Sequence, residues 1–127
     1  MAIVSISLDE EILEATDMLM AKNGYRGRSD IVRTGLRNLI ADSKKLESLH
    51  GKVSCVLMLV HKEKFEDFVS KTKHKFESLV LTHLHSKLQS EKCLDLFIVS
   101  GDADKIRQLV NTLESSRKVD YIKSFVP

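Results

Sequence analysis

The stretch KVSCVLMLV at residues 52–60 decides the fold of the second half of this chain. It is a nearly continuous apolar run, which is typical of a strand covered on its buried side. Helical spacing of apolar residues follows over 62–73 and again over 103–115. The remaining segments with strand character are 76–85, 93–100 and 119–126. The predicted order of elements after residue 50 is therefore βαββαβ.

This order predicts an α+β domain over residues 51–127. Two helices in such an order pack naturally on one face of an antiparallel sheet, which is the ferredoxin-like split βαβ arrangement. His50-Gly51 marks the change of periodicity and hence the expected boundary with a first domain over residues 1–50.

The first domain opens with a strict alternation, IVSISL at residues 3–8, which has the period of a half-buried strand. Asp9 is the expected N-cap of a helix that ends at Asn23-Gly24. Ser29 is the expected N-cap of a second helix, which extends to about residue 48. A short strand and two helices of this length cannot bury a core alone.

Composition limits the class of protein. The chain has 127 residues, 43% hydrophobic and 30% charged, and a formal net charge of +2. No apolar stretch approaches the roughly 18–20 residues of a membrane span, and the N-terminus turns acidic where a signal peptide would stay apolar. We therefore expect a cytoplasmic protein with no membrane partner. A local basic cluster at Lys22, Arg26, Arg28, Arg33 and Arg37 has the charge that nucleic acid attracts.

Three residues are candidate metal ligands: His74, His85 and Cys93. A hairpin would bring His85 and Cys93 together, because one ends a strand-like run and the other begins the next. Imidazole and thiolate donors suit nickel, copper, zinc or cobalt. The alternative is that all three residues are structural. His50 and His61 are interpreted as junction and loop residues without a partner, and Cys55 as core.

The chain resembles the nickel-responsive repressors of the NikR type over its whole length. The stretches that carry the resemblance are VSISLDEEILEATD, GYRGRSDIVR and LHSKLQSEKCLDLFIVSGD. It implies an N-terminal ribbon-helix-helix domain, in which two chains pair their strands, followed by an ACT-like domain that binds metal and joins two such dimers into a tetramer.

The resemblance also implies a square-planar nickel site, of which His74, His85 and Cys93 match three ligands. The family's fourth ligand falls on Lys87, whose protonated ammonium cannot ligate. His83, two residues from His85 on the same strand face, is a possible replacement. Water could instead fill the fourth position, or the metal could differ from nickel. The histidine at position 74 would come from a neighbouring subunit.

For the first domain, the ribbon-helix-helix resemblance implies contact with the DNA major groove. Ile3, Ser5 and Ser7 would face base edges, and Ile3 stands where the family tends to have a basic residue. Arg28, with the backbone amide of Ser29 at the helix start, would hold a phosphate.

The expected function is therefore a metal-responsive, DNA-binding transcriptional regulator, in which the bound metal controls operator binding and the chain acts as a repressor. The alternative keeps DNA binding but makes the ACT-like domain a sensor of an amino acid or other small ligand. No catalysis is expected, because nothing supplies an oxyanion hole or an orienting acid for Cys93 and His85.

Overall fold

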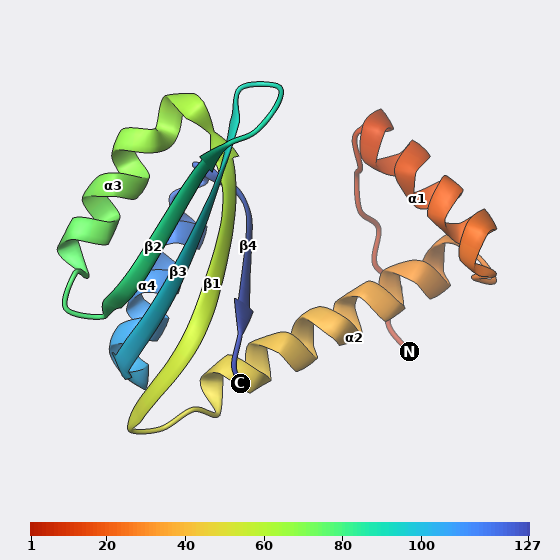
Figure 1. Cartoon of the computed structure of the whole chain (residues 1–127). Coiled ribbons are helices and arrows are strands. Elements are labelled where there is room, and N and C mark those ends of the chain that lie inside the picture. The colour runs from red at the N-terminus through yellow and green to blue at the C-terminus, as the bar shows by residue number, and fades with distance from the viewer. The chain divides into compact units, whose positions relative to one another are not determined.

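The computed structural model describes all residues from Met1 to Pro127. It divides into two compact units, Met1–Lys44 and Lys45–Pro127. The second unit contains the sheet, and the first contains helices only (Figure 1).

The second unit has the predicted βαββαβ order, with a single 3-10 turn added before the first helix. Its elements are β1 (Lys52–Lys62), η1 (Glu63–Phe65), α3 (Glu66–Lys75), β2 (Val80–Lys87), β3 (Lys92–Asp102), α4 (Ala103–Ser115) and β4 (Val119–Phe125). The four strands lie in the order β2-β3-β1-β4, and all neighbouring pairs are antiparallel. The α+β class and the ferredoxin-like arrangement predicted for this half are confirmed.

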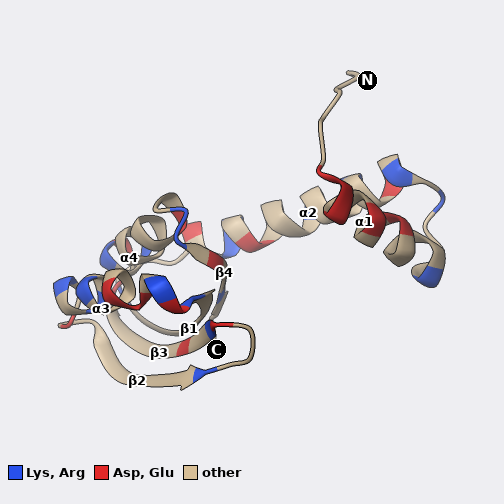
Figure 2. Ribbon diagram, turned by 90° about the horizontal axis from the view of Figure 1, so that it is seen from above, with Lys and Arg blue, Asp and Glu red and all other residues tan.

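Helices α3 and α4 lie on the same side of the sheet (Figure 2). The side chains that face them alternate along the two central strands, because successive residues of a strand point to opposite faces. On β1 these are Cys55, Leu57, Leu59 and His61, and on β3 they are Cys93, Asp95, Phe97 and Val99, all of them buried. Ile106, Leu109 and Leu113 of α4 complete the core.

The opposite face of the sheet is also apolar but has no helix over it. We call it the open sheet face. Its residues on the central strands are Val56, Met58 and Val60 of β1 and Leu94, Leu96 and Ile98 of β3, with Tyr121 and Phe125 beside them on β4. Met58 is 38% exposed and Phe125 is 63% exposed. Such a face is uncommon on a protein that acts as a single copy.

The first unit contains α1 (Glu10–Asn23) and the greater part of α2 (Arg28–Glu47). The start of α1 agrees with the prediction, since the Asp9 carboxylate accepts a hydrogen bond from the Ile12 amide at 2.8 Å. Its end agrees too, because Gly24 has a left-handed conformation, with φ of 71°, that glycine adopts without strain. The predicted cap at Ser29 is wrong. Helix α2 begins at Arg28, and Ser29 lies in its first turn.

The predicted strand over residues 3–8 is absent from the single chain. Residues 1–9 have no regular secondary structure, and their side chains are exposed. The physical reason is that a strand needs a neighbour for its backbone hydrogen bonds, and the first unit offers no second strand. The predicted two-stranded ribbon is therefore not confirmed by this structure.

Several boundaries in the second unit differ from the predictions, most clearly between α3 and β2. Helix α3 continues to Lys75, and β2 begins at Val80 rather than at residue 76, because residues 76–79 form a turn closed by the Leu79 amide donating to the Phe76 carbonyl at 2.9 Å. His61 is the tenth residue of β1 and not a loop residue. None of the helices combines the length and apolar character that crossing a bilayer requires.

Candidate metal centre

The strand register gathers nitrogen, sulfur and oxygen donors on the helix-facing side of the sheet. Across β1 and β3, His61 lies opposite Cys93. Across β2 and β3, His85 lies opposite Asp95, and Lys87 lies opposite Cys93. Because all of these positions share one face, their side chains converge beneath the start of α3.

Two overlapping sets of donor atoms result. The first set consists of His61, His85 and Cys93. Each residue contributes one ligand atom, and the three atoms lie within 4.8 Å of one another. The second set consists of His83, His85 and Asp95, whose ligand atoms also lie within 4.8 Å of one another. His85 belongs to both sets, so the two cannot be considered independent sites.

Asp95 is the centre of the hydrogen bonding in this cluster. Its side chain is 1% exposed, and its Oδ2 lies 2.6 Å from His61 Nε2. Its Oδ1 lies 2.5 Å from His83 Nε2 and 3.0 Å from His85 Nδ1. Burial alone would raise the pKa of Asp95, but the hydrogen bonds from the three histidines outweigh it and hold the pKa below its ordinary value. Asp95 is therefore an ionised acceptor that fixes three imidazole rings.

Cys93 is fully buried, with 0% exposure. Burial raises the pKa of its thiol, and the negative charges of Glu66 and Glu63 raise it further. A protonated thiol is the resting state at neutral pH, and a metal ion would have to displace that proton.

Lys87 occupies the position where the resemblance implies the fourth ligand. Its ammonium lies 2.9 Å from Glu63 Oε1, and that hydrogen bond raises the pKa of Lys87 further above its ordinary value. An ammonium has three donors and no lone pair. Lys87 is thus held in the form that cannot bind a metal.

His74 lies apart from the cluster of its own chain. It is in the last turn of α3, its side chain is 83% exposed, and its Nδ1 lies 3.2 Å from Glu77 Oε2. Of the sequence-predicted residues, the structure brings His85 and Cys93 together and adds His83 through Asp95, whereas His74 points to solvent.

Sequence reasoning missed His61 and Asp95. The interpretation of His61 as a loop residue without a partner is wrong, because it is fully buried in β1 and bonded to Asp95. A signal was present in both strands. Positions 55, 57, 59 and 61 point to one face of β1, and positions 93, 95, 97 and 99 point to one face of β3. Most of these residues are apolar, so that face is expected to be buried, and a carboxylate buried there requires a hydrogen-bond partner.

The residues predicted to contact DNA lie in the first unit. Ile3, Ser5 and Ser7 are exposed. Arg28 forms a bidentate ion pair with Asp17, with Nε to Oδ1 at 3.0 Å and Nη2 to Oδ2 at 2.9 Å. The hydrogen bond from Arg28 lowers the pKa of Asp17. Acidic residues gather at the start of α1, and basic residues surround the turn that leads to α2 (Figure 2).

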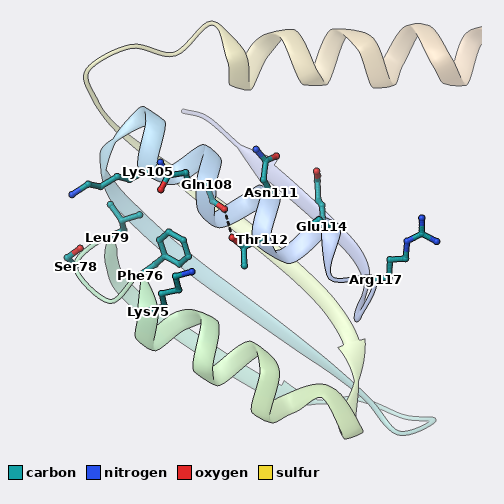
Figure 3. Close-up of a pocket in the computed structure, with 11 residues that line it drawn as sticks. Lys75, Phe76, Ser78, Leu79, Lys105, Gln108, Asn111, Thr112, Glu114 and Arg117 are labelled. Carbon is teal, nitrogen blue, oxygen red and sulfur yellow. Dashed lines mark hydrogen bonds between the residues drawn. The ribbon is translucent and has the colours of Figure 1, made fainter.

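A cavity of about 1030 Å³ lies away from the donor cluster, between the end of α3 and α4 (Figure 3). Its lining mixes polar and apolar side chains, among them Lys105, Arg117 and Phe76, and it contains no histidine and no cysteine. It is therefore separate from the candidate metal centre.

A ferredoxin-like sheet that carries imidazole, thiolate and carboxylate donors on its buried face defines a metal-binding α+β domain. Residues 51–126 match the family model described as the NikR C-terminal nickel-binding domain. The chain belongs to the NikR family of nickel-responsive regulators, and nickel is the metal of that family. The donors present fit it, since imidazole and thiolate are ligands that nickel accepts readily.

Relatives with known names cover nearly the whole chain. A protein of Halobacterium salinarum, named as a nickel-responsive regulator, is 33% identical over 128 residues, which span 95% of this chain and 89% of the relative. A protein of the same name from Methanocaldococcus jannaschii is 29% identical over 123 residues, 94% of this chain and 87% of its own length.

Among solved structures, an uncharacterized protein of Thermotoga maritima has a similar fold. The TM-score is 0.54 at 19% identity, and the match covers 59% of this chain and 96% of that protein. At this identity the likeness supports the fold of the second unit and nothing further.

Proposed function

We propose that this chain is a nickel-dependent transcriptional repressor that binds operator DNA as a homotetramer. In this proposal residues 1–50 form a ribbon-helix-helix domain that contacts DNA, and residues 51–127 form an ACT-like domain that binds nickel. His85 and Cys93 of one copy and His74 of a neighbouring copy are ligands. Nickel bound between copies then controls how the DNA-binding halves are placed.

The observation that carries the proposal is the lack of a core in the first unit. Neither α1 nor α2 contains a buried residue. Apolar side chains remain exposed along both helices and the N-terminal segment, among them Ile6 at 60%, Leu36 at 53% and Leu39 at 63%. Burying an apolar side chain stabilises a protein by roughly 1.5–3 kcal/mol, so this unit favours pairing with a second copy.

Such pairing would turn the alternating segment at residues 3–8 into a two-stranded ribbon. One face of the ribbon, with Val4, Ile6 and Leu8, would be buried by the helices. The other, with Ile3, Ser5 and Ser7, would face the major groove, where serine hydroxyls bond base edges and an isoleucine contacts a thymine methyl group. Arg28 and the amide of Ser29 would hold a phosphate at the start of α2.

The open sheet face supports the second association. It presents apolar side chains from three strands at its centre, and identical surfaces pair most simply about a two-fold axis. A second copy of the sheet is the proposed occupant. Two ribbon-paired dimers joined through this face make a tetramer.

The role of the metal follows from the donors. When bound, nickel would supply a Lewis acid, and His85 and Cys93 of one copy would hold it together with His74 of a neighbouring copy. Cys93 contributes its sulfur after giving up its proton, and Asp95 orients His85 through a hydrogen bond of 3.0 Å to Nδ1. Glu63 and Glu66 add negative charge that favours a cation at this position.

The proposal is tested by selecting DNA with the full-length protein. A pool of random-sequence duplexes is enriched with nickel-loaded protein, and the selected duplex is then titrated with and without nickel. We expect a sequence with two related half-sites, bound at least tenfold more tightly with nickel than after chelation. A Cys93→Ala variant serves as the metal-deficient control and should behave like the chelated protein.

Two outcomes contradict the proposal. Failure to enrich any duplex would remove the DNA-binding role. Equal affinity for the selected duplex with and without nickel would leave a DNA-binding protein that does not respond to the metal.

A further inference from the structure

The nickel site described above lacks one protein ligand that the family pattern supplies from the strand β2. Lys87 stands at that position, and its ion pair with Glu63 at 2.9 Å keeps its nitrogen occupied. The question is which other side chain of the same chain reaches the space beside His85 and Cys93. The structure offers two histidines, His61 on β1 and His83 on β2.

His61 approaches the thiol from the opposite strand. Register places it directly across from Cys93, and its side chain is 1% exposed. A ligand atom of His61 lies within 4.8 Å of those of His85 and Cys93. Donors about 2.0–2.3 Å from one ion are at most about 4.6 Å apart. Small side-chain movements would therefore bring all three atoms onto one metal.

The orientation of the His61 ring is that of a metal ligand. Its Nδ1 lies 2.8 Å from the backbone carbonyl of Lys62. A carbonyl oxygen only accepts hydrogen bonds, so Nδ1 carries a hydrogen. Nε2 faces the cluster and is bonded to Asp95 at 2.6 Å, a hydrogen bond that a metal bound at Nε2 would replace. Histidines that bind metals commonly donate their other ring N–H to a backbone carbonyl, which fixes the tautomer and the ring plane.

His83, unlike His61, does not belong to the set of donors that contains the Cys93 thiol. Its ring stacks on Phe97 with centroids 4.4 Å apart, and its Nε2 is bonded to Asp95. The set to which it belongs contains Asp95 in place of Cys93 and therefore has no sulfur. Register explains the difference, because His83 lies opposite Phe97, farther along β3 than Asp95.

We propose that His61 is a nickel ligand and takes the place left by Lys87, so that His61, His85 and Cys93 hold the ion within one chain. The proposal rests on the nickel-responsive function proposed above. With His74 of a neighbouring copy, the donor set is again three imidazoles and one thiolate. Its composition matches that of the family, although one ligand comes from a different strand.

The test compares His61→Gln with His83→Gln in the full-length protein. The two variants are matched, because each removes one histidine bonded to Asp95, and only His61 belongs to the set with Cys93. Nickel affinity is measured by competition with a chelator, and the sulfur-to-nickel charge-transfer band is recorded in the near ultraviolet. Unfolding of both metal-free variants in urea shows that each retains the fold.

We expect His61→Gln to weaken nickel binding by more than about 100-fold and to alter the charge-transfer band. Losing a residue that only hydrogen-bonds a metal ligand lowers metal affinity by about 10–100-fold, and losing the ligand itself should lower it further. We expect His83→Gln to weaken binding by less than about tenfold. Wild-type affinity and spectrum in His61→Gln would overturn the proposal, as would a larger loss in His83→Gln.

A measurement on the unmodified protein covers the case in which His61→Gln fails to fold. Wild-type protein with ¹⁵N-labelled histidine is titrated with zinc, a diamagnetic probe, and its ring nitrogens are followed by NMR. The Nε2 resonance of His61 should shift on binding, and an unchanged resonance would overturn the proposal. Wild-type protein that takes up no nickel would instead contradict the proposed function itself.

Discussion

At Asp95, a single buried carboxylate accepts hydrogen bonds from His61, His83 and His85. The arrangement holds the rings in place before any metal arrives, so the centre is preorganised. It also makes the fold depend on one charge, because each histidine would lose its partner if that charge were removed.

We expect Asp95→Asn to lower the free energy of unfolding of the metal-free protein by about 3 kcal/mol, since the substitution removes a buried charged group that accepts three hydrogen bonds. Because the folded pKa of Asp95 lies below its ordinary value, this stabilisation is complete above about pH 4 and is lost as pH falls through the folded pKa. Urea unfolding across this pH range measures both effects.

Asp120→Asn is the control for this experiment. Asp120 pairs with Lys92 at 2.8 Å, but both side chains are more than a third exposed. Its loss should cost less than about 1 kcal/mol. Equal effects of the two substitutions would contradict the central role of Asp95.

Cys93 gives the metal centre a defined response to pH. Its thiol has a raised pKa, chiefly through burial, so nickel must displace a proton to reach the sulfur. Nickel affinity should therefore rise with pH, by about tenfold per unit for one displaced proton, below the pKa of the thiol. Chelator competition at several pH values near neutrality, with proton release followed by an indicator dye, measures it. An affinity independent of pH would show that the thiol is not a ligand.

At the scale of the element, Arg28, the first residue of α2, forms an ion pair with Asp17 of α1. The pair ties the two helices of the first unit together and occupies the side chain that we expect at a phosphate. DNA binding would thus compete with Asp17 for Arg28. Substitutions at the two positions should have opposite effects.

We expect Arg28→Ala to weaken binding to all duplexes alike and to reduce the dependence of affinity on salt, because the lost contact is to phosphate. Asp17→Asn should strengthen binding, since it frees Arg28 and removes a negative charge. Fluorescence anisotropy with labelled duplexes at several salt concentrations measures both. Ser5→Ala, by contrast, should change base preference, and full affinity and salt dependence in Arg28→Ala would exclude the proposed contact.

The sequence was sufficient to predict the helices and strands whose ends depend on residues close by in the chain. Asp9 and Gly24 define α1 through a side-chain cap and a left-handed residue, and the apolar run at 52–60 defines most of β1. The predicted strand at residues 3–8 is absent from the single chain, where it has no neighbouring strand for its backbone hydrogen bonds. The partnership of His61 with Cys93 was hidden for another reason. It depends on β1 and β3 being neighbours, a property of the sheet order and not of any spacing along the chain.

At the scale of the whole molecule, the proposed site couples metal binding to assembly. His74 is solvent-exposed in its own chain, while His85 and Cys93 lie in the cluster. If His74 ligates across copies, nickel and the tetramer stabilise each other. By linkage, DNA with two half-sites should then tighten nickel binding by the same factor by which nickel tightens DNA binding.

Mixing two defective variants tests this coupling. His74→Ala and Cys93→Ala should each abolish nickel-enhanced DNA binding while leaving the fold intact. Mixed tetramers should recover a fraction of sites, because a chain without His74 still offers His85 and Cys93 to a neighbour that retains His74. Native mass spectrometry confirms subunit exchange, and nickel content measures recovery. No recovery in exchanged tetramers would place the whole site within one chain.

Helix α3 has a further consequence in this arrangement. Its first residue, Glu66, lies 3.3 Å from His85 through its carboxylate, and its last turn carries His74. Ten residues of helix form a rod of about 15 Å. One end would therefore sense the ion held by its own chain and the other the ion of a neighbour. Each α3 helix would be a rigid connection between two nickel sites. Filling one site would then change the geometry of the next, and the tetramer would bind nickel cooperatively.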